Sequence, residues 1–462
     1  MKKFKGKKVA ILGLSTEGRD TVKFFAREES SILCCDMRSR SELGTIYTSL
    51  SAYPVMFQLG KSYLQNLQDF DYIVKTQGMS PRLPELVSLR RQGKKITSNT
   101  ALFFELCQAR IIGVTGTKGK GTTSTLIYEI LKSTGKQVFL GGNVGTPLLS
   151  KVRDIQSSDW VVLELSSFQL EDLQQSPHIA VVLPITQDHL ANFDPLATNF
   201  HSSQKSYVEA KRSIIRFQSS SDIIVYNADN LTSSAFGIAS KAKRFSFSGC
   251  RSASCDAYVS NHEAWIRKDG SVTKIAALGK IPLLGDHNLE NIAAAALVSV
   301  NIGVSVSAIC RAVKRFHGLP HRLELVRTVG GVAYYNDSFS TVPETTIAAI
   351  RSFNAPLILI LGGSEKGSNF TQLGQKIAAS GIVKAIIVIG QMTECIARSL
   401  AGARYQGKVV TGCLSMHEIV HRATKETRAG DIVLLSPACA SFDMFPNYKE
   451  RGLQFKYEVA RL

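Results

Sequence analysis

The chain has 462 residues, which is too long for one ordinary hydrophobic core and predicts two or three domains. Hydrophobic residues make up 44% and charged residues 20%, a globular composition, and no apolar run approaches the roughly 20 residues that span a bilayer. The formal net charge of +18 is high, but the basic residues are scattered and accompany no nucleic-acid-binding motif. Nucleic acid is therefore not an expected partner, whereas clefts that bind small anions are compatible with the charge.

The cysteines and the N-terminal residues indicate the cytoplasm. Nine cysteines are scattered without a CxxC pair, which argues against a disulfide framework or a zinc ribbon. The basic start, residues 1–8, is followed by an apolar run, residues 9–14, that is too short for the core of a signal peptide. We therefore expect a cytoplasmic protein without a membrane span.

Residues 1–98 are predicted to form a Rossmann-like α/β domain. Residues 8–12 indicate a buried strand, residues 13–18 a turn into a helix, and residues 31–35 a second strand that ends at Asp36. Ser15 stands where a dinucleotide fingerprint has its middle glycine, so the motif favours NAD only weakly. Backbone N–H groups at this helix start could still hold a diphosphate, and Asp36 could accept a hydrogen bond from a sugar or uracil.

Two further α/β domains are expected at residues 99–318 and 319–462. In the central one, apolar runs at 111–114, 160–165 and 180–185 predict strands of a P-loop ATPase-type parallel sheet, covered on both faces. Shorter alternating runs near 244–280 predict a small antiparallel patch. In the last domain, which is also expected to be Rossmann-like, strands are predicted at 332–335, 357–361, 385–389, 409–410 and 432–435.

The strongest local signal is the glycine-rich run Thr115–Thr123, which lies between a predicted strand and a predicted helix. Glycines allow close approach of phosphate to backbone N–H groups, and a lysine at the position of Lys120 bridges the outer phosphates. The pattern is not a strict Walker A motif, because Gly121 follows the lysine where Ser or Thr is usual. The hydroxyl group that holds Mg²⁺ is therefore expected from Thr122 or Thr123.

Two other strand ends should lie beside this loop. Glu164 lies near the end of one strand, and His189 follows the next. Because the carboxyl ends of parallel strands lie at one edge of a sheet, these side chains should converge with the loop at a magnesium site. From their local sequence alone, Lys211 is a surface lysine of a helix and Asn288 a helix-capping residue.

Several motifs together resemble the Mur ligase family, and within it the UDP-N-acetylmuramoylalanine–D-glutamate ligases. The motifs occur in the family's order along nearly the whole chain. They are Gly141–Gly145, Leu163–Glu171, Gly318–Arg322, Tyr335–Ser338 and Leu435–Ser441. The resemblance implies three domains, which bind the UDP end of the sugar substrate, bind ATP, and close over both.

The resemblance also implies the roles of individual residues and the substrates. The substrates would be UDP-N-acetylmuramoyl-L-alanine and D-glutamate, with ATP and two Mg²⁺ ions, and the enzyme a monomer. Catalytic roles are implied for Lys120, Lys211, His189 and Glu164. ATP would be bound by Gly116, Thr117, Lys118, Gly119, Lys120, Gly121, Thr122, Thr123, Asn288, Arg322 and Asp337. The metal ligands would be Thr122, Glu164, His189 and, if carbamylated, Lys211. The UDP-sugar would be held by Leu14, Ser15, Thr16, Asp36, Arg38, Asn143 and Ser166, and the amino acid by Lys366 and Ser441.

Some residues depart from the family pattern and leave alternatives open. Lys118 and Gly121 stand where the family usually has Asn and Ser or Thr. The resulting Lys-Gly-Lys-Gly form resembles folylpolyglutamate synthases, which lack the first domain. Phe339 replaces a lysine near the acceptor amino acid, Ala191 an aspartate after the metal histidine, and residues 75–81 lack the usual Ser-Pro-Gly. The alternatives are therefore an amide ligase with another acceptor, or a binding protein for nucleotides or UDP-sugars without turnover.

Overall fold

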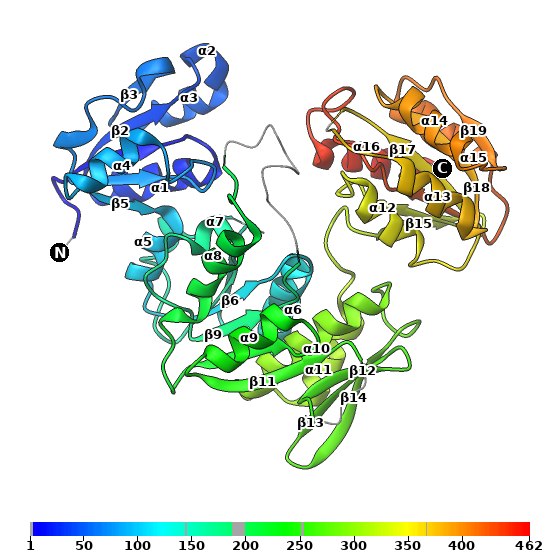
Figure 1. The fold of residues 1–462 in the computed structure, drawn as a ribbon, viewed down its shortest axis with the longest axis horizontal. Helices are drawn as coiled ribbons and strands as arrows, with labels where there is room; N and C mark the ends of the chain where they lie inside the picture. The colour runs from blue at the N-terminus through cyan, green and yellow to red at the C-terminus, as the bar shows by residue number, and fades with distance from the viewer. Residues whose placement is uncertain (1–2, 144–145, 187–198, 251–253, 366) are drawn as a thin grey trace. The chain divides into compact units, whose positions relative to one another are not determined.

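The computed structural model describes residues 3–143, 146–186, 199–250, 254–365 and 367–462 (Figure 1). The chain forms two compact units, one made of Met1–Ala277 with Asp286–Lys314 and the other of Leu278–Gly285 with Arg315–Leu462. The first unit holds a five-stranded and a nine-stranded sheet, and the second holds a six-stranded sheet. The expected α/β class with mainly parallel sheets is confirmed, while the three-way division at residues 98 and 318 stays a prediction.

The five-stranded sheet is parallel throughout, with the order β3-β2-β1-β4-β5. Its strands are β1 (Lys8–Leu12), β2 (Ser31–Asp36), β3 (Val55–Leu59), β4 (Tyr72–Lys75) and β5 (Lys95–Ser98). The helices of this part are α1 (Thr16–Arg27), α2 (Arg40–Leu43), α3 (Thr45–Leu50), α4 (Pro84–Arg91) and α5 (Asn99–Leu106), with short 3₁₀ turns at Gly60–Ser62 and Leu67–Asp69. The predicted strands and helix of this domain are therefore present.

Both faces of this sheet are covered by apolar side chains. Successive residues of a strand point to opposite faces, and the adjacent cysteines of β2 follow this rule. Cys34 packs with Ile11 in the cluster that contains the aromatic residues of α1, whereas Cys35 packs with Leu12 in the cluster on the other face. Burial raises the pKa of each of these two thiols to about 12. The sheet is thus an internal layer, which explains the continuous apolar runs of its strands.

The nine-stranded sheet has the order β14-β13-β12-β11-β10-β9-β6-β8-β7. Its strands are β6 (Arg110–Thr115), β7 (Val138–Gly142), β8 (Trp160–Glu164), β9 (Ile179–Val182), β10 (Ile223–Asn227), β11 (Lys243–Ser248), β12 (Ala257–Ser260), β13 (Glu263–Lys268) and β14 (Ser271–Ala277). Pairing is parallel from β7 to β12, and only β12, β13 and β14 pair antiparallel. The antiparallel patch is therefore real but smaller than expected, because β11 continues the parallel sheet.

Six further helices follow α5 along this part of the chain. They are α6 (Lys120–Lys132), α7 (Ser167–Leu170), α8 (Gln204–Arg216), α9 (Leu231–Ala239), α10 (Asp286–Asn301) and α11 (Val306–Arg315), with a 3₁₀ turn at Leu149–Lys151. Strand β9 ends three residues earlier than its apolar run predicts. Pro184 lies just beyond its end and has no N–H group to donate, so the run continues as irregular backbone along the edge of the sheet.

The six-stranded sheet of the second unit has the order β15-β16-β20-β17-β18-β19, in which only β15 and β16 pair antiparallel. Its strands are β15 (Glu324–Val329), β16 (Val332–Asn336), β17 (Leu357–Gly362), β18 (Val383–Ile389), β19 (Lys408–Val410) and β20 (Ile432–Leu435). The helices are α12 (Pro343–Ile350), α13 (Thr371–Ser380), α14 (Thr393–Gly402), α15 (Met416–Lys425) and α16 (Tyr448–Ala460). All five predicted strands are present. Across the described ranges of the chain, no helix has both the length and the apolar character needed to cross a bilayer.

A buried ion pair joins the two sheets of the first unit. Lys75 at the end of β4 places its Nζ atom 2.6 Å from Oδ2 of Asp172, which follows α7; the two side chains are 1% and 12% exposed. The contact is an ion pair whose alignment is poor for a hydrogen bond. Because a buried charge without its partner is strongly disfavoured, each of these residues requires the other.

Replacing Lys75 alone should therefore destabilise the first unit. We expect Lys75→Met to lower the free energy of unfolding by about 3–5 kcal/mol, since it leaves Asp172 buried and uncompensated. The double variant Lys75→Met/Asp172→Leu should recover most of this loss. Both tryptophans of the chain, Trp160 and Trp265, lie in the first unit, so urea unfolding followed by tryptophan fluorescence reports on it directly.

A matched control is Lys274→Met, which removes a pair between Lys274 and Glu263 whose side chains are 47% and 27% exposed. This change should cost less than about 1 kcal/mol. Equal losses for the two lysine variants would contradict the importance of burial for the pair.

Candidate nucleotide and substrate site

The glycine-rich run Thr115–Thr123, called the phosphate loop below, leads from the end of β6 into the first turn of α6, as its sequence predicts. Gly119 precedes the helix with a φ angle of +84°, a conformation that favours glycine. A Cβ atom at this position would lie 2.4 Å from Oδ1 of Asn291 on α10. The loop therefore requires glycine here both for its backbone conformation and for close packing against a neighbouring helix.

Two amines converge on this loop. Nζ of Lys120 donates to the carbonyl oxygens of Gly116 and Thr117 at 3.1 and 2.9 Å. Nζ of Lys211 on α8 donates to Oγ1 of Thr115 at 3.2 Å and to the carbonyl oxygen of Gly116 at 3.0 Å. Lys211 is only 1% exposed, so it is not the surface lysine that its local sequence indicates. The result is a positively charged cradle at a helix N-terminus, which is suited to phosphate.

Thr117 ties the phosphate loop to the loop that follows β9. Its N–H donates to the carbonyl oxygen of Pro184 at 2.9 Å, and its hydroxyl donates to the carbonyl oxygen of Thr186 at 3.1 Å. The same hydroxyl lies 3.1 Å from the phenol oxygen of Tyr207 on α8. These bonds fix two strand ends relative to each other. Lys118, by contrast, is exposed.

The structure distinguishes the two threonines that could hold a metal. The hydroxyl of Thr123 is fully buried and donates to Oδ1 of Asn291 at 3.1 Å, so it holds the loop against α10. Asn291 in turn donates to Oδ1 of Asn288 at 3.1 Å. Asn288 therefore lies inside the first turn of α10 rather than capping it. Thr122 remains the better candidate for a metal ligand.

Asn291 is a site residue that the sequence analysis missed. The available signal was a pair of amides three residues apart on an alanine-rich helix, because buried side-chain amides need partners.

Glu164 at the end of β8 has the properties of a cation ligand. The side chain is buried, its Oε1 atom accepts a hydrogen bond from Nδ2 of Asn143 at 3.1 Å, and its Oε2 atom has no hydrogen-bond partner among the described residues. A buried carboxylate oxygen without a donor is costly unless a cation compensates it. His189 lies outside the described residues. Among the described ones, no group of three His, Cys, Asp or Glu side chains forms a preassembled metal cluster.

The predicted UDP contacts Leu14, Asp36 and Arg38 come together at the ends of β1 and β2. Oδ2 of Asp36 accepts from the N–H of Leu14 at 2.8 Å, and both of its oxygens accept from the Arg38 guanidinium, at 2.9 and 2.8 Å. Burial acts to raise the pKa of Asp36, but these hydrogen bonds and the arginine charge outweigh it, and the pKa is lowered. Ser15 and Thr16 lie beside them as the N-cap and first residue of α1.

A hydrogen-bonded network connects the first turn of α1 with the loop of Ser166. Ser166 caps α7, and its hydroxyl donates to Oε1 of Gln77, which follows β4, at 2.9 Å. The carboxylate of Glu17 accepts from the N–H of Gln77 at 3.2 Å and from Nε2 of Gln169 at 2.9 Å. Burial raises the pKa of Glu17. Gln77, Glu17 and Gln169 were missed because each is an ordinary polar residue until the two sheets pack.

In the second unit, Asp337 organises the turn that carries Arg322. The Asp337 side chain is 5% exposed and accepts from the hydroxyls of Ser340 and Ser436 at 2.5 and 2.7 Å and from the N–H of Leu323 at 3.2 Å. Burial raises its pKa to about 6, although these hydrogen bonds and the charge of Arg322 act against it. Both carboxylate oxygens of Asp337 therefore accept hydrogen bonds from groups of the second unit.

The predicted amino-acid contact Ser441 is buried beside a fully buried arginine. The Arg451 guanidinium on α16 donates to the hydroxyl of Ser338 and to three carbonyl oxygens, at 2.9 to 3.1 Å. These acceptors belong to Ser338, Cys439 and Ala440, so the arginine holds the loop before Ser441 against the loop after β16. Lys366 lies outside the described residues.

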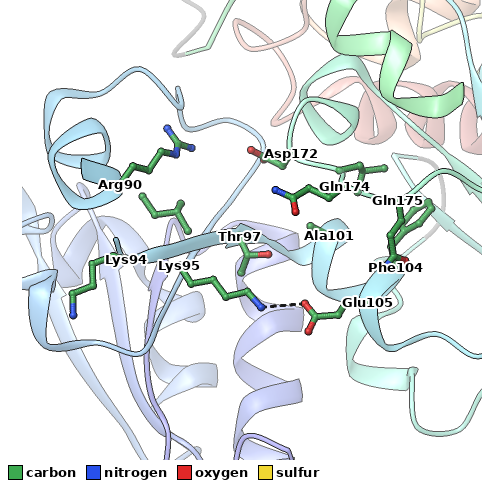
Figure 2. A pocket seen from close by; sticks show the side chains of 12 residues that line it. Arg90, Lys94, Lys95, Thr97, Ala101, Phe104, Glu105, Asp172, Gln174 and Gln175 are labelled. Carbon is green, nitrogen blue, oxygen red and sulfur yellow. Dashed lines mark hydrogen bonds and ion pairs between the residues drawn. The ribbon is translucent and has the colours of Figure 1, made fainter. Parts of the chain in front are cut away.

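A cavity of about 520 Å³ in the first unit lies apart from these groups (Figure 2). Its walls come from α4, β5, α5 and the segment after α7, and they include Arg90, Lys95, Glu105 and Asp172. Lys95 and Glu105 form an ion pair across it at 3.4 Å. None of the predicted site residues lines this cavity.

Comparison with known proteins identifies the family. Residues 114–299 match the Mur ligase middle domain, and residues 321–439 match the glutamate ligase domain of Mur ligases. The chain is 38% identical to the UDP-N-acetylmuramoylalanine–D-glutamate ligase of Acetivibrio thermocellus, covering 98% of this chain and 96% of that protein. It is also 38% identical to the ligase of the same name from Symbiobacterium thermophilum, covering 98% of each.

The chain belongs to the UDP-N-acetylmuramoylalanine–D-glutamate ligase family. Solved Mur ligases share its fold. The UDP-N-acetylmuramate–alanine ligase of Thermotoga maritima has a TM-score of 0.60 at 17% identity, covering 98% of this chain and 99% of that one. A second ligase from that organism, solved in complex with ADP, has a TM-score of 0.56 at 17% identity, covering 100% and 96%. As a member of the family, the protein is an ATP-dependent amide ligase.

The raised pKa of Asp337 predicts a pH dependence of stability. Its pKa is about 6 in the folded protein against an ordinary value of 3.8, so the folded state binds the proton more tightly. Its contribution to stability is therefore fully present below about pH 4 and is lost as the pH rises through about 6, on the order of 3 kcal/mol in all.

Asp337→Asn should remove this contribution, so its unfolding free energy should fall less between pH 4 and 6 than that of the wild type. Urea unfolding followed by hydrogen-exchange mass spectrometry of the β17 and β20 peptides measures this for the second unit. Glu344→Gln, at an exposed position on α12, is the control and should keep the wild-type slope. Parallel pH profiles for wild type and Asp337→Asn would refute the assignment.

Proposed function

We propose that the protein joins D-glutamate to UDP-N-acetylmuramoyl-L-alanine at the expense of ATP, releasing ADP and phosphate, in the synthesis of peptidoglycan precursors. The observation that carries this proposal is 38% identity over 98% of the chain to ligases of that name. The cytoplasm is the expected compartment, in agreement with nine free cysteines, and a monomer is the expected form.

The reaction requires activation of a carboxylate, which is a poor acylating agent because it is anionic and resonance-stabilised. An oxygen of the L-alanine carboxylate attacks the γ-phosphorus of ATP, and the bond to ADP breaks. The amine of glutamate then attacks the carbonyl carbon of the acyl phosphate, loses a proton, and phosphate leaves. Catalysis of such a transfer consists mainly of positioning and neutralisation of charge.

The charged groups around the phosphate loop suit this requirement. Lys120 would turn from the carbonyl oxygens that it contacts to the outer phosphates of ATP, at the N-terminus of α6. Lys211, buried against the same loop, would orient phosphate or metal, as a carbamate if it is carbamylated. Arg322 and Asp337 from the second unit would act on the nucleotide, and Lys366 and Ser441 would receive the amino acid.

Two Mg²⁺ ions are part of the proposal. The buried Oε2 atom of Glu164 and the hydroxyl of Thr122 are oxygen ligands of the kind that Mg²⁺ prefers, and His189 and carbamylated Lys211 would complete the set. When bound, the ions would neutralise phosphate charge and hold the reacting anions together. At the other end of the substrate, Asp36, Arg38 and the N-terminus of α1 would hold the uridine diphosphate, with Asn143 and Ser166 on the sugar.

Phosphate release tests the proposed function. The assay contains ATP, Mg²⁺ and UDP-N-acetylmuramoyl-L-alanine, with D-Glu, L-Glu, D-Lys or D-Asp added separately. We expect release with D-Glu alone. Release only with another amino acid would mean that the protein is a ligase with a different acceptor. Phe339 is the residue that raises this alternative. Absence of phosphate release with all four amino acids would favour a binding protein or another carboxylate substrate.

Glu164→Gln tests the metal site. The substitution keeps the shape of the side chain but removes the charge of the buried oxygen, so we expect at least a ~100-fold loss of kcat/KM, partly relieved at high Mg²⁺ concentration. The measurement is ligase activity as a function of Mg²⁺ concentration. Glu129→Gln, at a partly buried position on α6, is the matched control and should behave as wild type. An unchanged Mg²⁺ dependence in Glu164→Gln would exclude Glu164 as a ligand.

A further inference from the structure

The turn that presents Arg322 has an unusual backbone. His321 and Leu323, its two neighbours, have φ angles of +64° and +46°, in the left-handed region that residues with side chains rarely adopt. Hydrogen bonds from the loop after β16 hold the turn in place. Oδ1 of Asp337 accepts from the N–H of Leu323 at 3.2 Å, and the N–H of Phe339 donates to the carbonyl oxygen of His321 at 3.0 Å. Strained backbone persists only where its surroundings determine it, so the position of Arg322 is specified by the fold.

The Arg322 side chain is also held in position, by an aromatic ring. Its guanidinium carbon lies 3.8 Å from the centre of the Phe339 ring, the shortest contact between a cation and an aromatic ring among the described residues. Tyr448, the first residue of α16, supports this ring edge-on, with ring centres 5.2 Å apart and planes at 88°. Tyr448 also packs edge-on against His321, with ring centres 6.1 Å apart. One aromatic pair thus contacts both the arginine and its strained neighbour.

We propose that Phe339, supported by Tyr448, is a positioning residue that holds the Arg322 guanidinium for the nucleotide. This inference rests on the proposed function, in which Arg322 acts on ATP.

The geometry explains why an aromatic residue suits this position. Stacking uses the flat face of a guanidinium, whereas its N–H groups point outward in the plane, toward acceptors such as phosphate oxygens. A lysine at position 339 would instead place a second positive charge beside Arg322 and repel it. Phe339 remains 37% exposed, so the ring is not simply part of the hydrophobic core.

Two substitutions of Phe339 separate stacking from bulk. Phe339→Leu keeps an apolar side chain but removes the ring, and Phe339→Tyr keeps the ring. The readouts are the affinity of the full-length protein for ADP with Mg²⁺, by titration calorimetry, and the KM values for ATP and for the amino acid. We expect Phe339→Leu to weaken ADP binding and raise KM for ATP about fivefold, with KM for the amino acid and the melting temperature unchanged. Phe339→Tyr should stay within about twofold of wild type.

A matched control is Tyr457→Leu. Tyr457 is an exposed residue of α16, the helix that begins with Tyr448, and its ring contacts the Arg461 guanidinium. It should leave nucleotide affinity unchanged. Wild-type nucleotide affinity in Phe339→Leu would overturn the inference, as would a change confined to amino-acid preference, which would mean that Phe339 contacts the acceptor itself.

The calorimetric titration also keeps this inference separate from the proposed function. A wild-type protein that binds ADP but releases no phosphate with any amino acid would contradict the proposed function, and the ADP affinities would still decide the role of Phe339. Absence of ADP binding by the wild type would overturn both.

Discussion

Parallel strands that are covered on both faces leave polar groups at their carboxyl ends, and these groups must find partners away from water. In this protein the partners come from the neighbouring strand end. The hydroxyl of Thr115, at the end of β6, donates to the carbonyl oxygen of Leu165 beyond β8, and Thr117 bonds to the segment beyond β9. The same edge therefore carries both the hydrogen bonds that complete the fold and the groups that we propose to bind the nucleotide.

Buried cations follow from the same constraint. Lys75 has a carboxylate partner, whereas the hydrogen bonds of Arg451 go to one hydroxyl and three carbonyl oxygens. Burial lowers the pKa of Arg451 to about 10, which still leaves it protonated near neutral pH. Because this one cation donates to carbonyl oxygens of two loops, it holds these loops in position relative to each other.

The local sequence predicted those features that depend on local physics. The glycine pattern of the phosphate loop, the apolar runs of β6 and β8, and the strand end at Asp36 all reflect backbone conformation or burial on two faces. The same reasoning extended β9 too far, because its apolar run continues past Pro184, and it placed β11 in the antiparallel patch, because an alternating run does not specify the direction of pairing.

Features that depend on tertiary packing could not be predicted in this way. Lys211 is buried only because α8 packs against the phosphate loop, and the Gln77 side chain reaches Ser166 only when the two sheets of the first unit meet. The stacking of Arg322 on Phe339 likewise joins residues on different loops, so the local sequence could not show this contact. Family resemblance indicated some of these positions, but their contacts required the structure.

The two adjacent cysteines of β2 have a consequence for the chemistry of the intact protein. Their side chains point to opposite faces of the sheet and have pKa values of about 12, so both behave as small apolar residues with almost no thiolate at neutral pH. Cys250, in contrast, is exposed. Oxidants and alkylating reagents should therefore reach the surface thiol first, and the two cysteines in the core around the five-stranded sheet should react last.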